Sequence, residues 1–334
     1  MTMTVMPKET LRPPYDPEIL TIEDTQFRPV PSTTEELISL RIEEEQTDPS
    51  IADDSSLDIQ ERNVPGPRGD IRTLIVRANR SSGDQRDTPA PPLPCILFLH
   101  GGGRVMGNPY VGLSSVVQAA REDTAVIVCP AYALAPEHGG DAAAEDCYAT
   151  LLWLQQHDAE LGVDRDRLVL AGASAGGGLA AATAMTARDR GGPRVLAQLL
   201  ACPMLDDRCT TLSSRQFNNG PRGYYTRWGR FAWRCVLGDA AGTDAVVSCY
   251  AAPGRAEDLS GLPPAYIDVG SAEPFRDEAV AFARGLWEAG VQADLHVWGG
   301  GSHGFDMFLP SMWLGRQATK VREAWLRRVL MTRG

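Results

Sequence analysis

The sequence lacks the features that mark metal-binding, secreted and membrane proteins. Its seven cysteines are odd in number and scattered, and none forms a CxxC pair or a Cys/His cluster, so they indicate no metal site. The first 20 residues contain no apolar core of a signal peptide. No apolar run reaches about 18 residues, the length that a membrane-spanning helix needs. These absences predict a reduced, cytoplasmic protein without stable membrane association.

Positive charge is also scarce. The chain has 32 Lys and Arg against 43 Asp and Glu, a formal net charge of −11. Nucleic-acid binding depends on clustered Lys and Arg that meet phosphates, so this balance predicts no nucleic-acid partner. The same balance argues against polybasic anchoring to a membrane surface. Of the 334 residues, 43% are hydrophobic and 22% are charged. This composition is typical of a globular protein with a large core.

From residue 95 onward, short apolar runs alternate with Ala-rich amphipathic stretches. The predicted strands are 95–100, 125–130, 167–172, 196–202, 264–270 and 293–298. The predicted helices are 112–122, 142–157, 177–189, 276–290 and 311–330. Continuous apolar strands that alternate with helices are typical of a parallel sheet covered on both faces. The pattern therefore predicts an α/β fold.

One segment interrupts this alternation, and another segment precedes it. Residues 205–250 carry no pattern of a buried strand and are rich in Arg, Gly and aromatic residues, whereas residues 1–50 are mostly polar and acidic. Insertions in α/β sheets usually lie over the carboxyl ends of the strands, where ligands bind. We therefore predict a cap made of 1–50 and 205–250 over a core made of 51–204 and 251–334. The alternative is that the insertion is a surface excursion without a role.

Two local features follow from turn and cap chemistry. The stretch 32–46 predicts a helix that Ser32 and Glu35 would open as a capping box. The stretch 78–94 is rich in Ser, Gly, Asp and Pro, which predicts a loop between two strands.

The segment GASAG, residues 172–176, stands between a predicted strand and a predicted helix. This is the GxSxG pattern in the context that it requires, a tight turn that leaves room only for glycine at its ends. Such a turn would lift the hydroxyl of Ser174 to the edge of the sheet, and the helix behind it favours developing negative charge. Glycine-rich turns also produce this pattern by chance, so a close-packed strand–helix turn is the alternative.

Two further glycine loops follow predicted strands. The HGGG at 100–103 places consecutive backbone amides where they can point at one spot, as an oxyanion hole requires. A phosphate-binding loop or a plain turn is the alternative, although GxGxxG spacing and a P-loop lysine are missing. His303 lies in a Gly/Ser loop just past a strand, where a general base would be held. A lone loop histidine is usually only solvated, but this one completes the order Ser, acid, His.

Several motifs in fixed order carry a family resemblance. They are HGGG at 100–103, YALAPEH at 132–138, GASAG at 172–176, EPFRDE at 273–278 and HGF at 303–305. Together they resemble the hormone-sensitive-lipase-like carboxylesterases of the α/β-hydrolase superfamily, over roughly residues 90–320. The resemblance implies an α/β-hydrolase core, mostly parallel, with a helical cap. It also implies ester hydrolysis by a Ser–acid–His triad that needs no metal or organic cofactor.

By position, the resemblance implies the role of individual residues. Ser174 would be the nucleophile and His303 the base. The backbone amides of Gly102, Gly103 and Ala175 would form the oxyanion hole.

Three carboxylates are candidates for the triad acid, because GSAEPFRDEAV at 270–280 holds Glu273, Asp277 and Glu278. The family usually has Asp-Pro-Leu-Arg-Asp here with the first Asp as the acid, which implies Glu273. Glu273 also lies just past a predicted strand in a loop stiffened by Pro274, and either type of carboxylate can orient an imidazole. Asp277 stays the alternative, although a helix dipole explains an acid at the start of a helix without catalysis.

Three residues are candidates for substrate binding. Arg104 follows HGGG where the family often has an aromatic or apolar residue. It would either pair with a carboxylate of the cap or line the mouth of the pocket and attract an anionic or polar-headed substrate. Tyr225 and Trp228 belong to an aromatic stretch of the insertion that would form either the substrate-facing wall of the cap or its core.

The sequence thus predicts a serine carboxylesterase that acts on small to medium acyl esters through an acyl-enzyme. Its partner is a small-molecule ester. One alternative is the same triad dedicated to a natural-product ester, a lactone or an amide. Another is a non-catalytic binding protein, as in plant gibberellin receptors, which resemble this family but lack the histidine that His303 supplies here. Family members often dimerise, and the sequence leaves monomer and homodimer open.

Overall fold

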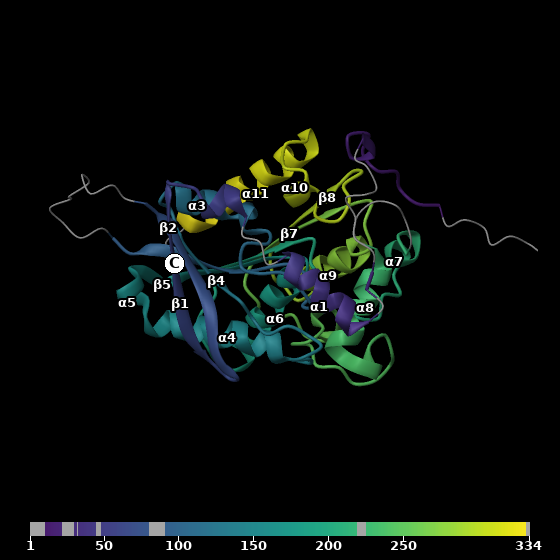
Figure 1. The fold of residues 1–334 in the computed structure, drawn as a ribbon, viewed down its shortest axis with the longest axis horizontal. Helices are drawn as coiled ribbons and strands as arrows, with labels where there is room; N and C mark the ends of the chain where they lie inside the picture. Colours follow the sequence, from purple (N-terminus) through teal and green to yellow (C-terminus); the bar gives the residue numbers. More distant parts are fainter. Residues whose placement is uncertain are drawn as a thin grey trace, which may run out of the picture.

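The computed structural model describes residues 11–21, 30–31, 33–44, 48–79, 91–218 and 225–331. Its centre is one eight-stranded sheet in the order β1-β2-β4-β3-β5-β6-β7-β8 (Figure 1). The strands are β1 (Leu57–Gly66), β2 (Gly69–Ala78), β3 (Leu93–Leu99), β4 (Val126–Pro130), β5 (Val163–Ala173), β6 (Ala197–Ala201), β7 (Ala265–Gly270) and β8 (Ala293–Trp298). Strand β2 is antiparallel to both of its neighbours, β1 and β4. All other neighbouring strands, from β4 through β3 to β8 in sheet order, pair in parallel. The predicted α/β fold is confirmed.

Helices cover both faces of this sheet. The α-helices are α1 (Thr34–Glu44), α2 (Pro49–Ala52), α3 (Val117–Arg121), α4 (Ala142–Gln156), α5 (Asp158–Leu161), α6 (Ala175–Asp189), α7 (Leu212–Gln216), α8 (Thr226–Leu237), α9 (Arg276–Glu288), α10 (Phe305–Phe308) and α11 (Trp313–Met331). Short 3-10 helices are η1 (Ile19–Thr21), η3 (Leu113–Ser115), η4 (Gly238–Ala240) and η5 (Pro253–Arg255). Within the described ranges, no helix combines the length and the apolar character that crossing a bilayer requires.

The core lies in two apolar layers, one on each side of the sheet. Leu151 of α4, Leu179 of α6 and Phe282 of α9 pack on one face. Val117 of α3 and Leu326 of α11 pack on the other, and Figure 1 shows α3 and α11 above the sheet with α4 and α6 below it. Because both faces are buried, the central strands are continuously apolar, which is why the sequence pattern located them.

The strand β1 was not predicted. Its central residues 60–63 are polar and exposed, since β1 is an edge strand that pairs only with β2 along the hairpin. An edge strand of this kind carries no continuous apolar run. The predicted loop at 78–94 does join β2 to β3, but residues 80–90 of it lie outside the described part of the chain.

The predicted helix at 32–46 begins one residue later than we expected. Helix α1 starts at Thr34, and the hydroxyl of Thr33 accepts a hydrogen bond of 3.2 Å from the amide of Glu36. An N-cap oxygen bonds an amide two or three residues on, so Thr33 and not Ser32 occupies the capping position. Ser32 itself lies outside the described residues.

Helix α1 and the insertion meet beside the glycine loop. Leu37 of α1 and Trp233 of α8 belong to one buried apolar cluster with Val105 and Met106, which follow HGGG. Figure 1 shows α1, α7 and α8 gathered at one end of the molecule, at the right in the view. The division into cap and core stays a prediction that this arrangement favours.

Candidate functional site

Ser174 stands at a sharp turn between β5 and α6. Its φ of 56° and ψ of −117° lie where a non-glycine residue is strained. A Cβ on Gly172 would lie 2.1 Å from the carbonyl oxygen of Gly176, and one on Gly176 would lie 1.9 Å from that of Leu99. Only glycine fits at these two positions, so the turn itself explains the GxSxG spacing. The strain is held in part by a 2.8 Å hydrogen bond from the amide of Ser174 to the carbonyl oxygen of Ala201.

Ser174, His303 and Glu273 form one hydrogen-bonded chain. The Oγ of Ser174 lies 2.9 Å from Nε2 of His303, and Nδ1 of His303 lies 2.5 Å from Oε2 of Glu273. A carboxylate only accepts, so Nδ1 carries the proton of the neutral ring and Nε2 is left to accept from the hydroxyl. All three are buried, with 6%, 6% and 1% of the surface of Ser174, His303 and Glu273 exposed. This arrangement can deprotonate the serine hydroxyl.

The strand ends bring these three residues together. Ser174 follows β5, Glu273 follows β7 and His303 follows β8, and parallel strands end at the same edge of a sheet. The two loops that carry the acid and the histidine are also in close contact. A Cβ on Gly270 would lie 2.0 Å from the carbonyl oxygen of Gly301, so glycine at the end of β7 lets the histidine loop approach.

The other two carboxylates of the 270–280 stretch have different partners. Asp277 accepts from the amide of Ser213 at 2.7 Å and pairs with Arg276 at 2.7 Å, so it connects α9 to α7. Burial raises the pKa of Asp277, but the hydrogen bonds from Arg276 and Ser213 outweigh burial and hold this pKa below its usual value. Glu278 accepts from the amide of Leu205 at 2.7 Å, and burial raises its pKa well above the ordinary range. The structure brings Glu273, and neither of these, to the imidazole.

The glycine loop after β3 lies directly against the serine turn. A Cβ on Gly101 would be 3.7 Å from the Cβ of Ser174. Gly102 and Gly103 have φ of 112° and 64°, in the left-handed region that favours glycine. Ala175 begins α6, and the first amides of a helix have no partner within it. Gly101 thus brings the glycine loop against the serine, and Ala175 follows the serine directly in the chain. An oxyanion hole formed by Gly102, Gly103 and Ala175 stays a prediction.

His100, the first residue of HGGG, is hydrogen-bonded to the glycine loop and stacked on Tyr132. Its Nδ1 donates to the carbonyl oxygen of Gly101 at 2.7 Å, and its ring stacks on Tyr132 with centroids 4.1 Å apart. The hydroxyl of Tyr132 in turn donates to the carbonyl oxygen of His100 at 2.7 Å. Burial lowers the pKa of His100 to about 4.

The buried His100 predicts a specific loss of stability in acid. Between pH 6.5 and 4 the unfolded chain protonates this ring and the folded chain does not, so the free energy of unfolding falls as the pH falls. We expect the wild type to lose about 2 kcal/mol more than His100→Asn between pH 7 and pH 5. Urea unfolding of both proteins at the two pH values measures this difference. Equal losses in the two proteins would contradict it.

A buried arginine connects the acid and histidine loops. Arg322 of α11 donates from Nη1 to Oδ2 of Asp306 at 2.7 Å and from Nη2 to Oδ2 of Asp268 at 2.8 Å. Asp306 comes three residues after His303, and Asp268 lies in β7 just before the loop of Glu273. Helix α11 thus connects both loops to the body of the fold. Sequence analysis missed this network, although an Asp inside the apolar strand β7 was a visible signal.

Removing Arg322 is expected to destabilise the protein strongly. Arg322→Met leaves two buried carboxylates without their cation, and breaking such a buried pair costs about 3–5 kcal/mol. Denaturant unfolding measures this cost. Arg328→Met, which removes a more exposed arginine of the same helix, is the matched control and should change little. An equal effect of the two substitutions would show that the buried network contributes nothing special.

Arg104 does not line the mouth of a pocket. It is 1% exposed, its guanidinium lies 5.0 Å from the ring centroid of Trp233, and Nη2 donates to the carbonyl oxygen of Ala251. Burial lowers the pKa of Arg104 to about 10. The mouth-lining interpretation is wrong because the side chain turns toward Trp233, in the buried apolar cluster that also contains Leu37 of α1. Its observed hydrogen bond goes to a carbonyl oxygen rather than to a cap carboxylate.

The two aromatic candidates differ in position. Trp228 is 8% exposed and packs edge-on against Phe231 within the same buried apolar cluster, which matches the interpretation that this aromatic stretch packs in a core. Tyr225 is partly exposed at the N-terminus of α8. A substrate contact for either side chain stays a prediction.

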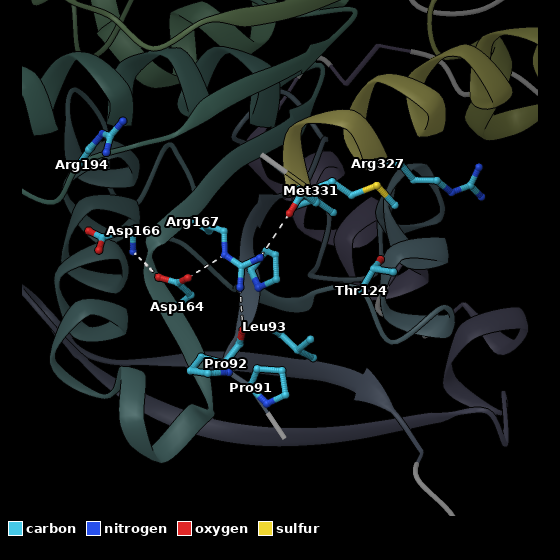
Figure 2. A pocket seen from close by; sticks show the side chains of 12 residues that line it. Pro91, Pro92, Leu93, Thr124, Asp164, Asp166, Arg167, Arg194, Arg327 and Met331 are labelled. Atoms are coloured by element: carbon cyan, nitrogen blue, oxygen red, sulfur yellow. Dashed lines mark hydrogen bonds and ion pairs between the residues drawn. The ribbon is translucent and has the colours of Figure 1, made fainter. Parts of the chain in front are cut away.

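A cavity of about 790 Å³ opens where the parallel strands begin, opposite the strand ends that carry Ser174, Glu273 and His303 (Figure 2). Its lining includes Leu93 at the start of β3, Asp164 near the start of β5 and Arg194 just before β6. In Figure 2 Arg167 is held by Asp164 and by the chain at Pro92. Strand β5 is 11 residues long, so this cavity lies about 30 Å from the serine turn and is separate from it.

Comparisons with known proteins identify the family and the fold. A family model described as alpha/beta hydrolase fold matches residues 96–307. Esterase LipI of Mycobacterium tuberculosis is 35% identical over 239 residues, 70% of this chain and 70% of that protein. Carboxylesterase NlhH of the same organism is 35% identical over 71% of this chain and 74% of its own length. The solved structure of a bacterial heroin esterase superposes with a TM-score of 0.84 at 33% identity, covering 95% of this chain and 98% of that one.

Proposed function

This chain belongs to the alpha/beta hydrolase fold family and is a carboxylic ester hydrolase, and we propose that it acts through Ser174, His303 and Glu273. The observation that supports this assignment most strongly is the unbroken hydrogen-bonded chain from the serine hydroxyl through the imidazole to the carboxylate. A non-catalytic binding protein would have no need to hold a buried imidazole in this tautomer.

The proposed reaction begins at Ser174. Its oxygen attacks the ester carbonyl while Nε2 of His303 takes the proton, and Glu273 stabilises the imidazolium that forms. The amides of Gly102, Gly103 and Ala175 stabilise the developing oxyanion, each contributing about 10²–10³ in rate. His303 then protonates the leaving alcohol, and an acyl group remains on the serine. A water molecule, activated by the same imidazole, releases the acid and restores the hydroxyl.

The proposal extends to the cap and the setting of the enzyme. We propose that α1 and the insertion with α7 and α8 form the cap that encloses the acyl chain, since their apolar side chains meet beside the glycine loop. This enclosure favours small to medium acyl groups. The seven cysteines are free, which favours a reducing compartment such as the cytoplasm. Monomer and homodimer both stay open.

Hydrolysis of p-nitrophenyl esters from acetate to dodecanoate tests this function. We expect kcat/KM to be highest for short or medium chains and to fall steeply at the long end, because a closed cap limits the length of the acyl group. A folded protein that hydrolyses none of these esters would contradict the proposed carboxylesterase. A rate that keeps rising to dodecanoate would contradict the size limit alone.

A further inference from the structure

Cys202 lies beside the acid and the histidine. Ligand atoms of Cys202, Glu273 and His303 all lie within 4.8 Å of one another. Cys202 follows the carboxyl end of β6, the strand between β5 and β7, so the topology places it at the same edge of the sheet as the triad. Its backbone has a φ of 37°, in the left-handed region, and its amide donates to the carbonyl oxygen of Asp268 at 2.7 Å. The thiol is therefore held in place by a strained and hydrogen-bonded backbone.

The three side chains are of the kinds that bind zinc. Thiolate, imidazole and carboxylate bind Zn²⁺ at about 2.0–2.3 Å in a tetrahedron, which places ligand atoms about 3.3–3.7 Å apart. The present limit of 4.8 Å exceeds that spacing by about 1 Å, a difference that rotation of the side chains must close. Cys202 is buried to the same degree as Ser174 and His303, with 5% of its surface exposed against 6% for each of these two.

Charge around the cysteine also favours a cation. The carboxylates of Glu273, Asp306 and Asp268 all interact electrostatically with Cys202, which is buried. The same carboxylates attract a divalent ion into a region of low dielectric, where such attraction is strong. Arg322 offsets two of these charges but is bonded to Asp268 and Asp306 rather than to Glu273.

We propose that Cys202, Glu273 and His303 form an inhibitory site for Zn²⁺, in which the ion captures the base and the acid of the triad. The binding step stands on the three side chains alone. The inhibition that follows rests on the proposed function.

Binding changes the imidazole in a defined way. The thiol of Cys202 loses its proton to solvent and its sulfur bonds the ion. Nδ1 of His303 bonds the ion in place of its proton, and the ring stays neutral by carrying that proton on Nε2. The Nδ1–Oε2 separation to Glu273, 2.5 Å in the structure, must widen to about 3.3 Å to admit the ion. Nε2 then donates instead of accepting, so it cannot take the proton of Ser174.

The test measures metal binding and inhibition separately. Zn²⁺ is titrated into the wild type, Cys202→Ala and Cys249→Ala by calorimetry, and ester hydrolysis is followed in the same series relative to each protein's own metal-free rate. Cys249 is a more exposed cysteine that is not part of this cluster, so it is the control for non-specific thiol binding. Cd²⁺ replaces Zn²⁺ in a third series, because the ultraviolet band of a cadmium–thiolate bond reports the sulfur directly.

We expect Cys202→Ala to weaken Zn²⁺ binding by about 100-fold or more and to remove the cadmium–thiolate band of this site. Inhibition should be lost in parallel, while Cys249→Ala should behave as the wild type and a chelator should restore activity. Equal Zn²⁺ affinity in the wild type and Cys202→Ala would overturn the site. Binding at Cys202 without inhibition would overturn the capture of the base. A protein that binds Cd²⁺ at Cys202 but hydrolyses no ester would contradict the proposed function and leave the binding site standing.

Discussion

Glu273→Gln is expected to lower kcat by about four orders of magnitude while the protein stays folded. Glu273 accepts from Nδ1 of His303 at 2.5 Å and has no exposed side-chain surface. An amide in its place can present its NH₂ group to the ring, which favours the tautomer with the proton on Nε2. It also removes the negative charge that stabilises the imidazolium. The rate of p-nitrophenyl ester hydrolysis at saturating substrate measures the loss.

Two neighbouring carboxylates supply matched controls for this prediction. Asp277→Asn and Glu278→Gln change the same chemical group four and five residues on, in side chains bonded to the amides of Ser213 and Leu205. We expect both to keep kcat within about tenfold, since their hydrogen bonds hold other parts of the fold together. If Asp277→Asn abolishes turnover and Glu273→Gln does not, the acid is misassigned. If all three variants lose activity together, the effect belongs to the fold of this loop.

Ser174→Ala is expected to remove nearly all catalysis, by about six orders of magnitude in kcat. Only the hydroxyl is lost, and the backbone turn is kept by the glycines on either side. Without the nucleophile no acyl-enzyme forms, and the remaining backbone amides and substrate binding give a residual rate of about 10³–10⁴-fold over that in water. Steady-state hydrolysis of p-nitrophenyl acetate measures the change, and binding of the ester should persist. Retention of a tenth of the activity would mean that another nucleophile carries the reaction.

The sequence predicted the central strands and the serine turn because burial and backbone geometry restrict which residues can stand at these positions. The central strands are buried on both faces and so appear as continuous apolar runs. Gly172 and Gly176 are needed because carbonyl oxygens occupy the space that a Cβ would take, so the GxSxG pattern reports real geometry. His303 and Glu273 could be placed because both follow strands that end at one edge of the sheet. Their pairing across 30 residues was expected from the family order and not from local pattern.

The remaining features depend on contacts that sequence patterns do not encode. For Arg104 the sequence left two roles open, pairing with a cap carboxylate or lining the mouth of the pocket. The structure shows neither, because its left-handed φ of 61° and the ring of Trp233 turn the side chain inward. Arg322 lies in α11, whereas its partners Asp268 and Asp306 lie in β7 and α10. The residues around Arg322 in the sequence therefore did not indicate this network. In the sequence, Cys202 looks like the other cysteines of apolar strands. Only the strand order β5-β6-β7 shows that β6 ends beside the strands that carry the triad, which places Cys202 there.

Trapping the nucleophile tests the central claim most directly. An aryl phosphonate ester that phosphonylates serine hydrolases is added in small excess, and the intact protein and its peptides are analysed by mass spectrometry alongside residual ester hydrolysis. The account predicts one phosphonyl group per chain, on Ser174, with activity lost in proportion to labelling and no label on Ser174→Ala. A label on any other residue, or full hydrolysis by a protein whose Ser174 is completely labelled, would contradict it.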